Sequence, residues 1–428
     1  MKSPSLESGG PNAAAPGLSS PEMMAYYGNR GLMWRNFSMI LLLNLGWAVS
    51  FTVINPLIQL RLNNAGVSEA GIGNIGAVNH WVYCYAVMFF AWKSDHTVTR
   101  FGRRIPYLFL SAPFIVFAIV MFPFCELKWV LIGLALLQMF FMDIKAATIP
   151  LLNIDCMPRK LLARMDAPSK MAMAALSFLA LRHGMKLSDQ SETLPFLLAG
   201  AILVATTLIG GFAIKEPPVR NPSTEGFRPF SAMKIAWRDK RAVVLMISVS
   251  LFETFQIAFV TWVWLYAQNA LGMTRAQTGL CVSWGILFSM CAAFPLGWLI
   301  DRVSPYRLLP VFCLICAGAA YCVLHARTPL FLTLAACLSY TLNVFYGASD
   351  IMVYRNAAPA EIGSVTSTNS FLRGAYRGVM ALLMGHLISR SGGCYDYVFI
   401  LAAALTVAGL VPLFIYRRLM AQPPRKES

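Results

Sequence analysis

Long apolar stretches alternate with short polar ones along almost the whole chain. Each apolar stretch is about 20 residues long, which is the length that an α-helix needs to cross a bilayer. The pattern predicts an all-α, polytopic membrane protein with twelve transmembrane helices. The expected helices are 37–60, 70–92, 106–124, 129–154, 165–181, 193–214, 242–268, 275–300, 308–325, 329–354, 363–388 and 396–416.

Two of the polar turns resemble each other. One begins Trp92-Lys-Ser-Asp95 and the other Trp298-Leu-Ile-Asp301, and each leaves one apolar helix and enters another. The two Asp residues are 206 positions apart in a chain of 428, which indicates a parallel repeat of two six-helix bundles. The predicted parts are a disordered tail (1–36), an N-terminal bundle (37–214), a linker loop (215–241), a C-terminal bundle (242–416) and a second tail (417–428).

Composition supports a membrane protein and fixes its orientation. Hydrophobic residues make up 57% of the chain and charged residues 13%, against about 25% charged in soluble domains. Of the 35 Lys and Arg, 25 lie on or near the side of the two tails, seven on the other side and three deep within helices. The positive-inside rule therefore places both termini in the cytoplasm, and we expect the plasma (inner) membrane. It also explains the net charge of +16 without a nucleic-acid partner.

Motifs of common enzymes and metal sites are missing from the sequence. There is no phosphate-binding Gly-x-x-x-x-Gly-Lys-[Ser/Thr] loop, no His-Glu-x-x-His, no paired Cys-x-x-Cys and no Gly-x-Ser-x-Gly elbow. Cys313 and Cys316 have metal-like spacing, but they lie within an apolar helix and are expected to pack there. We therefore expect no enzyme activity, no cofactor and no metal.

Ionisable residues within the predicted helices are the main candidates for function. Each costs roughly 2.5–3.5 kcal/mol at a helix centre, so it must face a hydrated cavity or a partner on another helix. One interpretation is that they bind substrate or a coupling proton, and the other is that they form ion pairs that only tie helices together. The six residues are Asp143, Lys145, Glu253, Asp350, Arg373 and Arg377.

Spacing limits how these charges pair. Asp143 and Lys145 are two residues apart and point to different sides of their helix, whereas Arg373 and Arg377 are four apart and share a face. Glu253 and Asp143 are both candidates to neutralise this arginine pair. Further candidates for the cavity wall are Asn55, His80 and Trp262, and side chains of these types also serve in packing or at the membrane interface.

The loop after the second helix carries a specific motif. Ser94-Asp95-His-Thr-Val-Thr-Arg100-Phe-Gly102-Arg103-Arg104-Ile-Pro106 closely resembles a motif of the glycoside–pentoside–hexuronide:cation symporters and the related sucrose transporters, within the major facilitator superfamily. The resemblance implies a secondary transporter that works by alternating access. It further implies an inner gate of Asp95, Arg100, Gly102, Arg103 and Arg104, with Asp301 and Arg302 as the second copy.

The same resemblance suggests roles within the helices. Asp143 lies in a segment where those symporters carry a substrate-binding carboxylate. Apart from the resemblance, we expect Lys145, Glu253 and Arg377 to be its cavity partners; Lys145 departs from those symporters, which usually have Pro at this position. Asp155, with Pro158 and Arg159, resembles the end of the fourth helix in the sucrose-transporter group. Melibiose-type members carry two acidic residues for a cation where this chain has Tyr83 and Val87, so their sodium site is not expected here. Proton coupling, uniport and efflux all stay open on this point, and a proton is the expected coupling ion.

The sequence thus predicts a monomeric, proton-coupled transporter of a small organic solute, most simply a sugar or glycoside. Two alternatives stay open at this stage. One is efflux of drugs or metabolites on the same fold. The other is a membrane sensor or assembly factor that does not transport.

Overall fold

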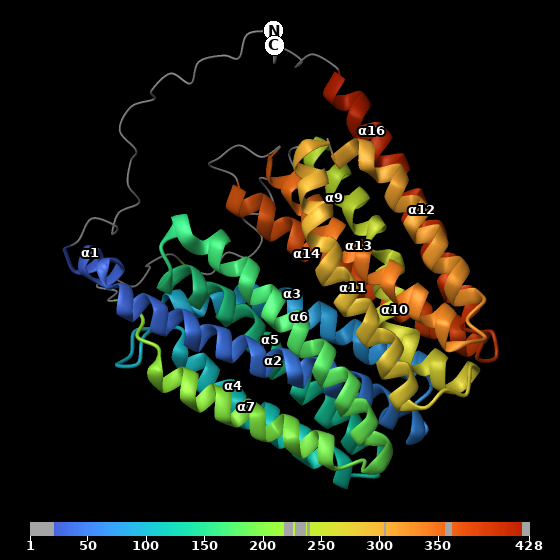
Figure 1. The fold of residues 1–428 in the computed structure, drawn as a ribbon, viewed down its shortest axis with the longest axis horizontal. Helices are drawn as coiled ribbons and strands as arrows, with labels where there is room; N and C mark the ends of the chain where they lie inside the picture. Colours follow the sequence, from blue (N-terminus) through green and yellow to red (C-terminus); the bar gives the residue numbers. More distant parts are fainter. Residues whose placement is uncertain are drawn as a thin grey trace.

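The computed structural model describes residues 21–217, 226, 237, 240–303, 305–355 and 362–421, and they contain no β-strand. The predicted all-α class is confirmed (Figure 1). The helices are α1 (Pro21–Gly28), α2 (Arg30–Asn64), α3 (Glu69–Asp95), α4 (Ile105–Met121), η1 (Phe122–Phe124), α5 (Lys128–Cys156), α6 (Arg159–Gln190), α7 (Leu194–Ala213), α9 (Lys240–Phe252), α10 (Thr254–Leu265), η2 (Tyr266–Ala270), α11 (Arg275–Arg302), α12 (Pro305–Leu324), α13 (Pro329–Arg355), α14 (Ile362–Arg390), α15 (Asp396–Ala408) and α16 (Leu410–Ala421).

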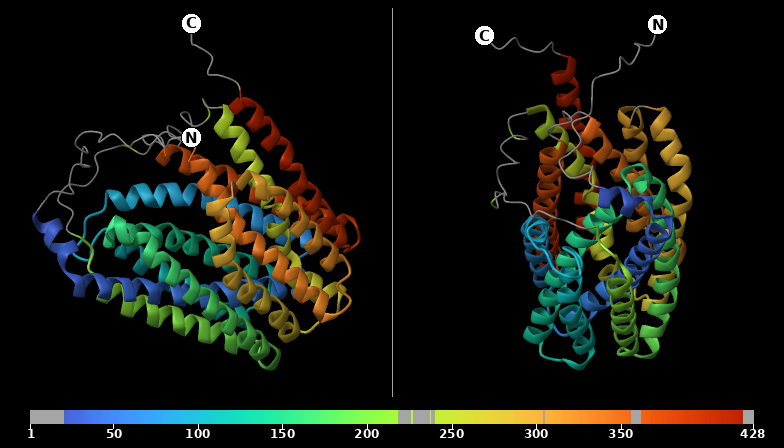
Figure 2. Two further views of the ribbon diagram at one scale, coloured as in Figure 1. Left: turned by 45° about the horizontal axis from the view of Figure 1, so that its top comes forward. Right: turned by 90° about the vertical axis from the view of Figure 1, so that its left-hand side faces the viewer.

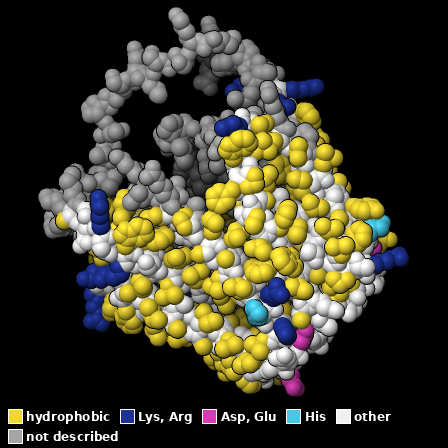
Figure 3. Space-filling view, viewed as in Figure 1, with side chains coloured by type: hydrophobic (Ala, Val, Ile, Leu, Met, Phe, Trp, Pro, Cys, Tyr) yellow, Lys and Arg dark blue, Asp and Glu magenta, His cyan; other side chains and the backbone are white. Residues whose placement is uncertain are grey.

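These helices account for all twelve predicted spans. The third span is α4 with η1, the seventh is α9, α10 and η2 in succession, and the twelfth is α15 with α16. Seven of the described spans are long and apolar enough to cross a membrane by themselves, and shorter apolar helices lie among the rest. The surface in Figure 3 is mostly hydrophobic, with Lys and Arg gathered largely near its edges, as expected where lipid tails cover the middle of the protein.

The helices form two groups, α2–α7 and α9–α16 (Figures 1 and 2). Between the groups, α3 packs against α14 and α6 packs against α11. We call the side where α2 begins and α16 ends the termini face, and the other side the opposite face. At the termini face α1 and α16 lie far apart, whereas the loops after α2 and η2 lie near each other at the opposite face (Figure 1).

The first helix begins earlier than predicted. Residues 1–36 were expected to be a disordered tail, yet α1 begins at Pro21 and α2 begins at Arg30, where the Asn29 side chain accepts a hydrogen bond from Leu32 N–H. The prediction missed this because it counted only apolar residues, whereas a helix can continue past the membrane surface with polar ones. Residues 1–20 lie outside the described part of the chain.

Other predicted helix boundaries were also wrong. Helix α6 covers Arg159–Gln190 rather than 165–181, so Arg182 and Lys186 are helical and not in a loop. At the far end, α16 continues to Ala421, into the range expected to be a tail. Of the predicted linker 215–241, most residues lie outside the described part.

The seventh span is interrupted at Glu253, and the break has a structural partner. It packs on the break between α15 and α16, where Ser248 Oγ donates to Gly409 O at 2.7 Å. Phe255 N–H donates to Thr406 Oγ1 at 3.1 Å. Side-chain hydroxyls thus bond to backbone groups at both breaks, which matters in a bilayer where water is absent. The break places Glu253 inside the C-terminal group, with only 1% of it exposed.

Candidate functional site

The loop between α3 and α4 is built around a tight turn. Thr99 and Gly102 pair through two backbone hydrogen bonds of 3.1 and 3.3 Å. Gly102 has φ +109°, a backbone conformation that residues other than glycine rarely adopt. The turn directs Arg103 and Arg104 back beneath the end of α3, where Asp95 is the last helical residue.

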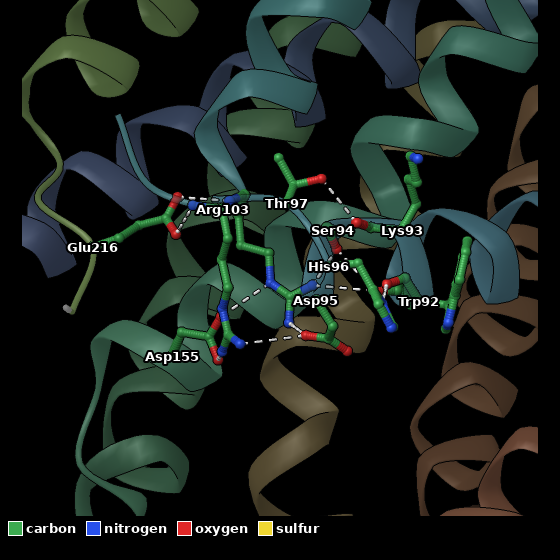
Figure 4. Close-up of polar contacts among 11 residues, drawn as sticks. Trp92, Lys93, Ser94, Asp95, His96, Thr97, Arg103, Asp155 and Glu216 are labelled. Carbon is green, nitrogen blue, oxygen red and sulfur yellow. Dashed lines mark hydrogen bonds and ion pairs between the residues drawn. The ribbon is translucent and has the colours of Figure 1, made fainter. Parts of the chain in front are cut away.

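Two arginines lie between two carboxylates at this turn (Figure 4). Arg104 donates to Asp95 at 2.5 Å and to Asp155 at 3.0 Å, and Arg103 donates to Asp155 at 2.6 Å and to Asp95 at 3.4 Å. Arg104 also bonds Ser94 and is 3% exposed. Burial disfavours the charge of Arg103, but the bond to Asp155 and the neighbouring carboxylates raise its pKa above the usual value. We call Asp95, Arg103, Arg104 and Asp155, with Glu216, the loop cluster.

Glu216 completes the loop cluster from beyond the sixth span. Its carboxylate accepts the backbone N–H groups of Arg103, Arg104 and Ile105 at 2.7 to 2.8 Å. These N–H groups begin α4 and have no partner within the helix, so the carboxylate caps it and meets the positive end of its dipole. Burial raises the pKa of Glu216, against the effect of these bonds. Sequence reasoning missed this residue, although an acid directly after a predicted span was a usable signal.

The remaining predicted gate residues are placed differently. Arg100 lies over the ring of Phe101 at 4.8 Å. Arg302 lies over the ring of Trp298 at 4.2 Å. The side chain of Asp301 lies outside the described part of the structure, so the second copy of the gate stays a prediction.

Gly102→Ala is expected to be more destabilising than Gly66→Ala. Both glycines have positive φ, so each substitution costs about 1–2 kcal/mol in the backbone. Only at Gly102 does the new Cβ meet a neighbour, because it would overlap the carboxylate of Glu216. If Glu216 withdraws, the cap of α4 is lost and a further 2–3 kcal/mol or so goes with it. Thermal unfolding of both purified variants measures the difference, and equal losses would contradict the role of Glu216.

Two adjoining cavities lie between the helical groups. The first, the charged lobe, has a volume of about 530 Å³ and is lined from one group by Asn44, Trp47, Tyr83 and Asp143 and from the other by Arg373 and Arg377. The second, the amide lobe, has a volume of about 570 Å³ and extends toward the opposite face. The lobes share Phe51, Asn79, His80, Met142 and Asp143 in their walls.

Glu253 binds two arginines of α14, Arg373 and Arg377. Its carboxylate forms ion pairs with Arg373 and, at 2.9 Å, with Arg377. This resolves the choice that the sequence left open between Glu253 and Asp143. The two arginines line the charged lobe while Glu253 lies behind them. The single carboxylate compensates one of the two positive charges, so the arginine pair presents a positive edge to the cavity.

Asp143 and Lys145 have no ion-pair partner among the described residues. Asp143 lies where the two lobes meet, is 8% exposed, and its Oδ2 has no hydrogen-bond partner in that part of the chain. Lys145 is fully buried and lies in the wall of neither lobe. An unpaired buried charge is costly, so the state of each group depends on what enters its surroundings.

Some of the other predicted site residues line the cavity and others do not. His80 lies in the walls of both lobes and Asn55 in that of the amide lobe. Trp262 is fully buried outside both, and Trp264 takes the place expected for it in the amide lobe. No group of three or more His, Cys, Asp and Glu suited to a metal occurs among the described residues.

At the opposite face a carboxylate joins the two groups. Glu192 pairs with Arg61 of its own group at 2.7 Å and with Arg275 of the other at 2.9 Å. Beside it, Asp189 accepts Ala276 N–H at 2.9 Å. The bond from Arg275, above all, lowers the pKa of Glu192. Sequence reasoning missed these contacts because they join residues at or near the ends of separate helices.

A second set of contacts closes the other edge of this face. Ala70 N–H donates to Ser389 Oγ at 2.9 Å, and Tyr395 donates to Glu69 at 3.2 Å. Gly73 lies so close to α14 that a Cβ would come within 2.6 Å of Ala381 O. The opposite face is therefore closed in this structure, by polar contacts at its edges and backbone approach between them.

Glu192→Gln is expected to loosen the opposite face. An exposed ion pair is worth up to about 1 kcal/mol, so the closed population should fall by up to about fivefold. Because the pKa of Glu192 is lowered, the wild-type contact persists above about pH 4.5 and is lost only as the pH falls through the lowered value. Spin-label distances across this face measure the opening. Glu126→Gln, an exposed acid on the same side, is the control and should leave the distances unchanged.

Comparisons with known proteins address the family. A sequence model described as Major Facilitator Superfamily matches residues 39–376 and 271–428. No curated protein matches the chain. Among solved structures, a point mutant of the nucleoside transporter NupG is similar, with TM-score 0.72 and 12% identity over 90% of this chain and 99% of that one. So is a bacterial homologue of the human lysosomal transporter Spinster, inward-facing and unoccupied, with TM-score 0.70 and 14% identity over 91% and 98%. The chain therefore belongs to the major facilitator superfamily.

Proposed function

We propose that this protein is a proton-coupled secondary transporter of a small, hydroxyl-rich solute, a sugar or glycoside, related to the glycoside–pentoside–hexuronide:cation symporters. The observation that carries the proposal is the cavity between the two groups. Among the described residues it holds an unpaired carboxylate, that of Asp143, surrounded by aromatic and amide side chains. Aromatic faces stack on sugar rings, amides bond hydroxyls, and a carboxylate can carry the proton.

The orientation follows from the charge bias. Of 35 basic residues 25 lie on the termini side, which makes that face cytoplasmic and the opposite face external. A state closed at the opposite face is then inward-facing. The similarity to an inward-facing Spinster homologue agrees with this assignment.

The loop cluster is assigned as the inner gate. The hydrogen bonds and ion pairs that its side chains form with other described residues all stay within the N-terminal group and its flanking residues. In the inward-facing state the charges of the loop cluster are therefore paired with one another and not with the described residues of the C-terminal group. When the cytoplasmic side closes, Asp95 and the two arginines are the groups available to bond the C-terminal group.

Uptake by the purified protein in proteoliposomes tests the proposal. Labelled sugars, aryl glycosides and nucleosides (which are N-glycosides) are offered with and without an inward proton gradient. Accumulation of at least one of them only with the gradient is the expected result. Gradient-independent uptake of a glycoside would remove the proton coupling, and failure of all of them under both conditions would remove the substrate class.

A further inference from the structure

The amide lobe contains a set of buried carbonyl oxygens without partners. Asn55 and Gln59 are four residues apart on α2 and share a face, and Gln138 approaches from α5. Their oxygens, Oδ1 of Asn55 and Oε1 of Gln59 and Gln138, have no hydrogen-bond partner in the described part of the chain. Gln138 is only 1% exposed, yet it lies in the wall of this lobe.

Such groups favour an occupant of the lobe that donates hydrogen bonds. A buried acceptor without a donor is unfavourable, and an apolar side chain of the same shape would remove that penalty. Three of them around one cavity form a wall that favours a ligand rich in hydrogen-bond donors. The remaining polar groups of the lobe are neutral (Gln256, Thr261 and Tyr340 among them), apart from Asp143 and His80 at the junction with the charged lobe.

We propose that Asn55, Gln59 and Gln138 form a hydroxyl-binding subsite, in which Gln138 determines specificity by accepting a hydroxyl group of the solute. The ligand class is an uncharged polyol ring. Asp143, five residues beyond Gln138 on α5, then lies at the edge of the bound ring, where it senses occupancy and holds the proton. This inference rests on the proposed function. It adds that the solute is recognised in the amide lobe, whereas proton coupling takes place in the charged lobe.

The variant Gln138→Met separates recognition from structure. Methionine is close in shape to glutamine and has no strong acceptor, so the unliganded variant should keep an unfolding midpoint within a few degrees of that of wild type. Its affinity for the solute should fall about tenfold or more. A purely structural Gln138 would instead lower the midpoint when replaced.

Thr207→Val is the matched control. Thr207 is also 1% exposed with an unpartnered hydroxyl among the described residues, but it lies on α7, outside both lobes. Its replacement tests the effect of removing a buried polar group alone. The affinity for the solute should not change in this variant.

The decisive measurement is binding of methyl glucosides and methyl galactosides, with their monodeoxy analogues, to the purified full-length protein in nanodiscs. In wild type, one deoxy analogue should bind about tenfold more weakly than its parent, and in Gln138→Met the two should bind equally. Discrimination that persists in the variant, or a lowered midpoint, overturns the subsite even if gradient-driven glycoside uptake is intact. If no methyl glycoside binds wild type, the subsite as a sugar-ring site is overturned, while the separate uptake panel decides the proposed function.

Discussion

Asp143→Asn should abolish uphill accumulation of solute while leaving downhill exchange measurable. With one proton per solute, a gradient of one pH unit supports about tenfold accumulation, because one pH unit corresponds to 1.36 kcal/mol. Asparagine keeps the shape of the side chain at the junction of the two lobes but cannot release a proton. The accumulation ratio should therefore fall to about one.

The measurement is the steady-state ratio of internal to external solute in proteoliposomes at several imposed gradients. Asp143→Glu, which keeps the carboxyl group, should retain part of the gradient dependence. Unchanged uphill uptake by the Asn variant would place the proton site elsewhere, and the buried Lys145 would be the next residue to replace.

Glu253→Ala should cause the largest loss of stability among single changes to the cavity region. The glutamate is 1% exposed and binds both Arg373 and Arg377. Removing one partner of a buried ion pair leaves uncompensated charge, at a cost of about 3–5 kcal/mol. The yield of monodisperse protein and its unfolding temperature should both drop.

A double variant distinguishes charge imbalance from lost packing. Glu253→Gln with Arg373→Gln removes one charge of each sign, so it should recover much of the stability that Glu253→Gln alone loses. Size-exclusion profiles after heating compare the variants. Equal losses in the single and double variants would show that charge compensation is not the role of Glu253.

The helical plan was readable from the sequence because bilayer spans depend on local composition. The apolar runs predicted the spans, and the four-residue spacing of Arg373 and Arg377 predicted their shared face. Helix boundaries that lie among polar residues were missed, as at the start of α2 and at both ends of α6. The break at Glu253 was also missed, because it depends on packing against Gly409 and Thr406, far along the chain.

The charged residues of the candidate site could be predicted from the sequence, whereas its neutral polar residues could not. An ionisable residue in a membrane helix is recognisable because its insertion into the bilayer is unfavourable, and Asp143 and Glu253 were found in that way. Glu216 and Glu192 lie at helix ends, where an acid is unremarkable until its partners are known. Gln138 was missed because a glutamine in a long helix has no distinctive pattern, and only the cavity reveals it.

Proton movement driven by the solute tests the central claim most directly. Proteoliposomes with a trapped pH dye and no imposed gradient receive an external glycoside that the protein takes up. The account predicts that the lumen acidifies as the solute enters and that Asp143→Asn shows no acidification. Solute entry through the wild-type protein without any change in lumenal pH would contradict proton-coupled transport.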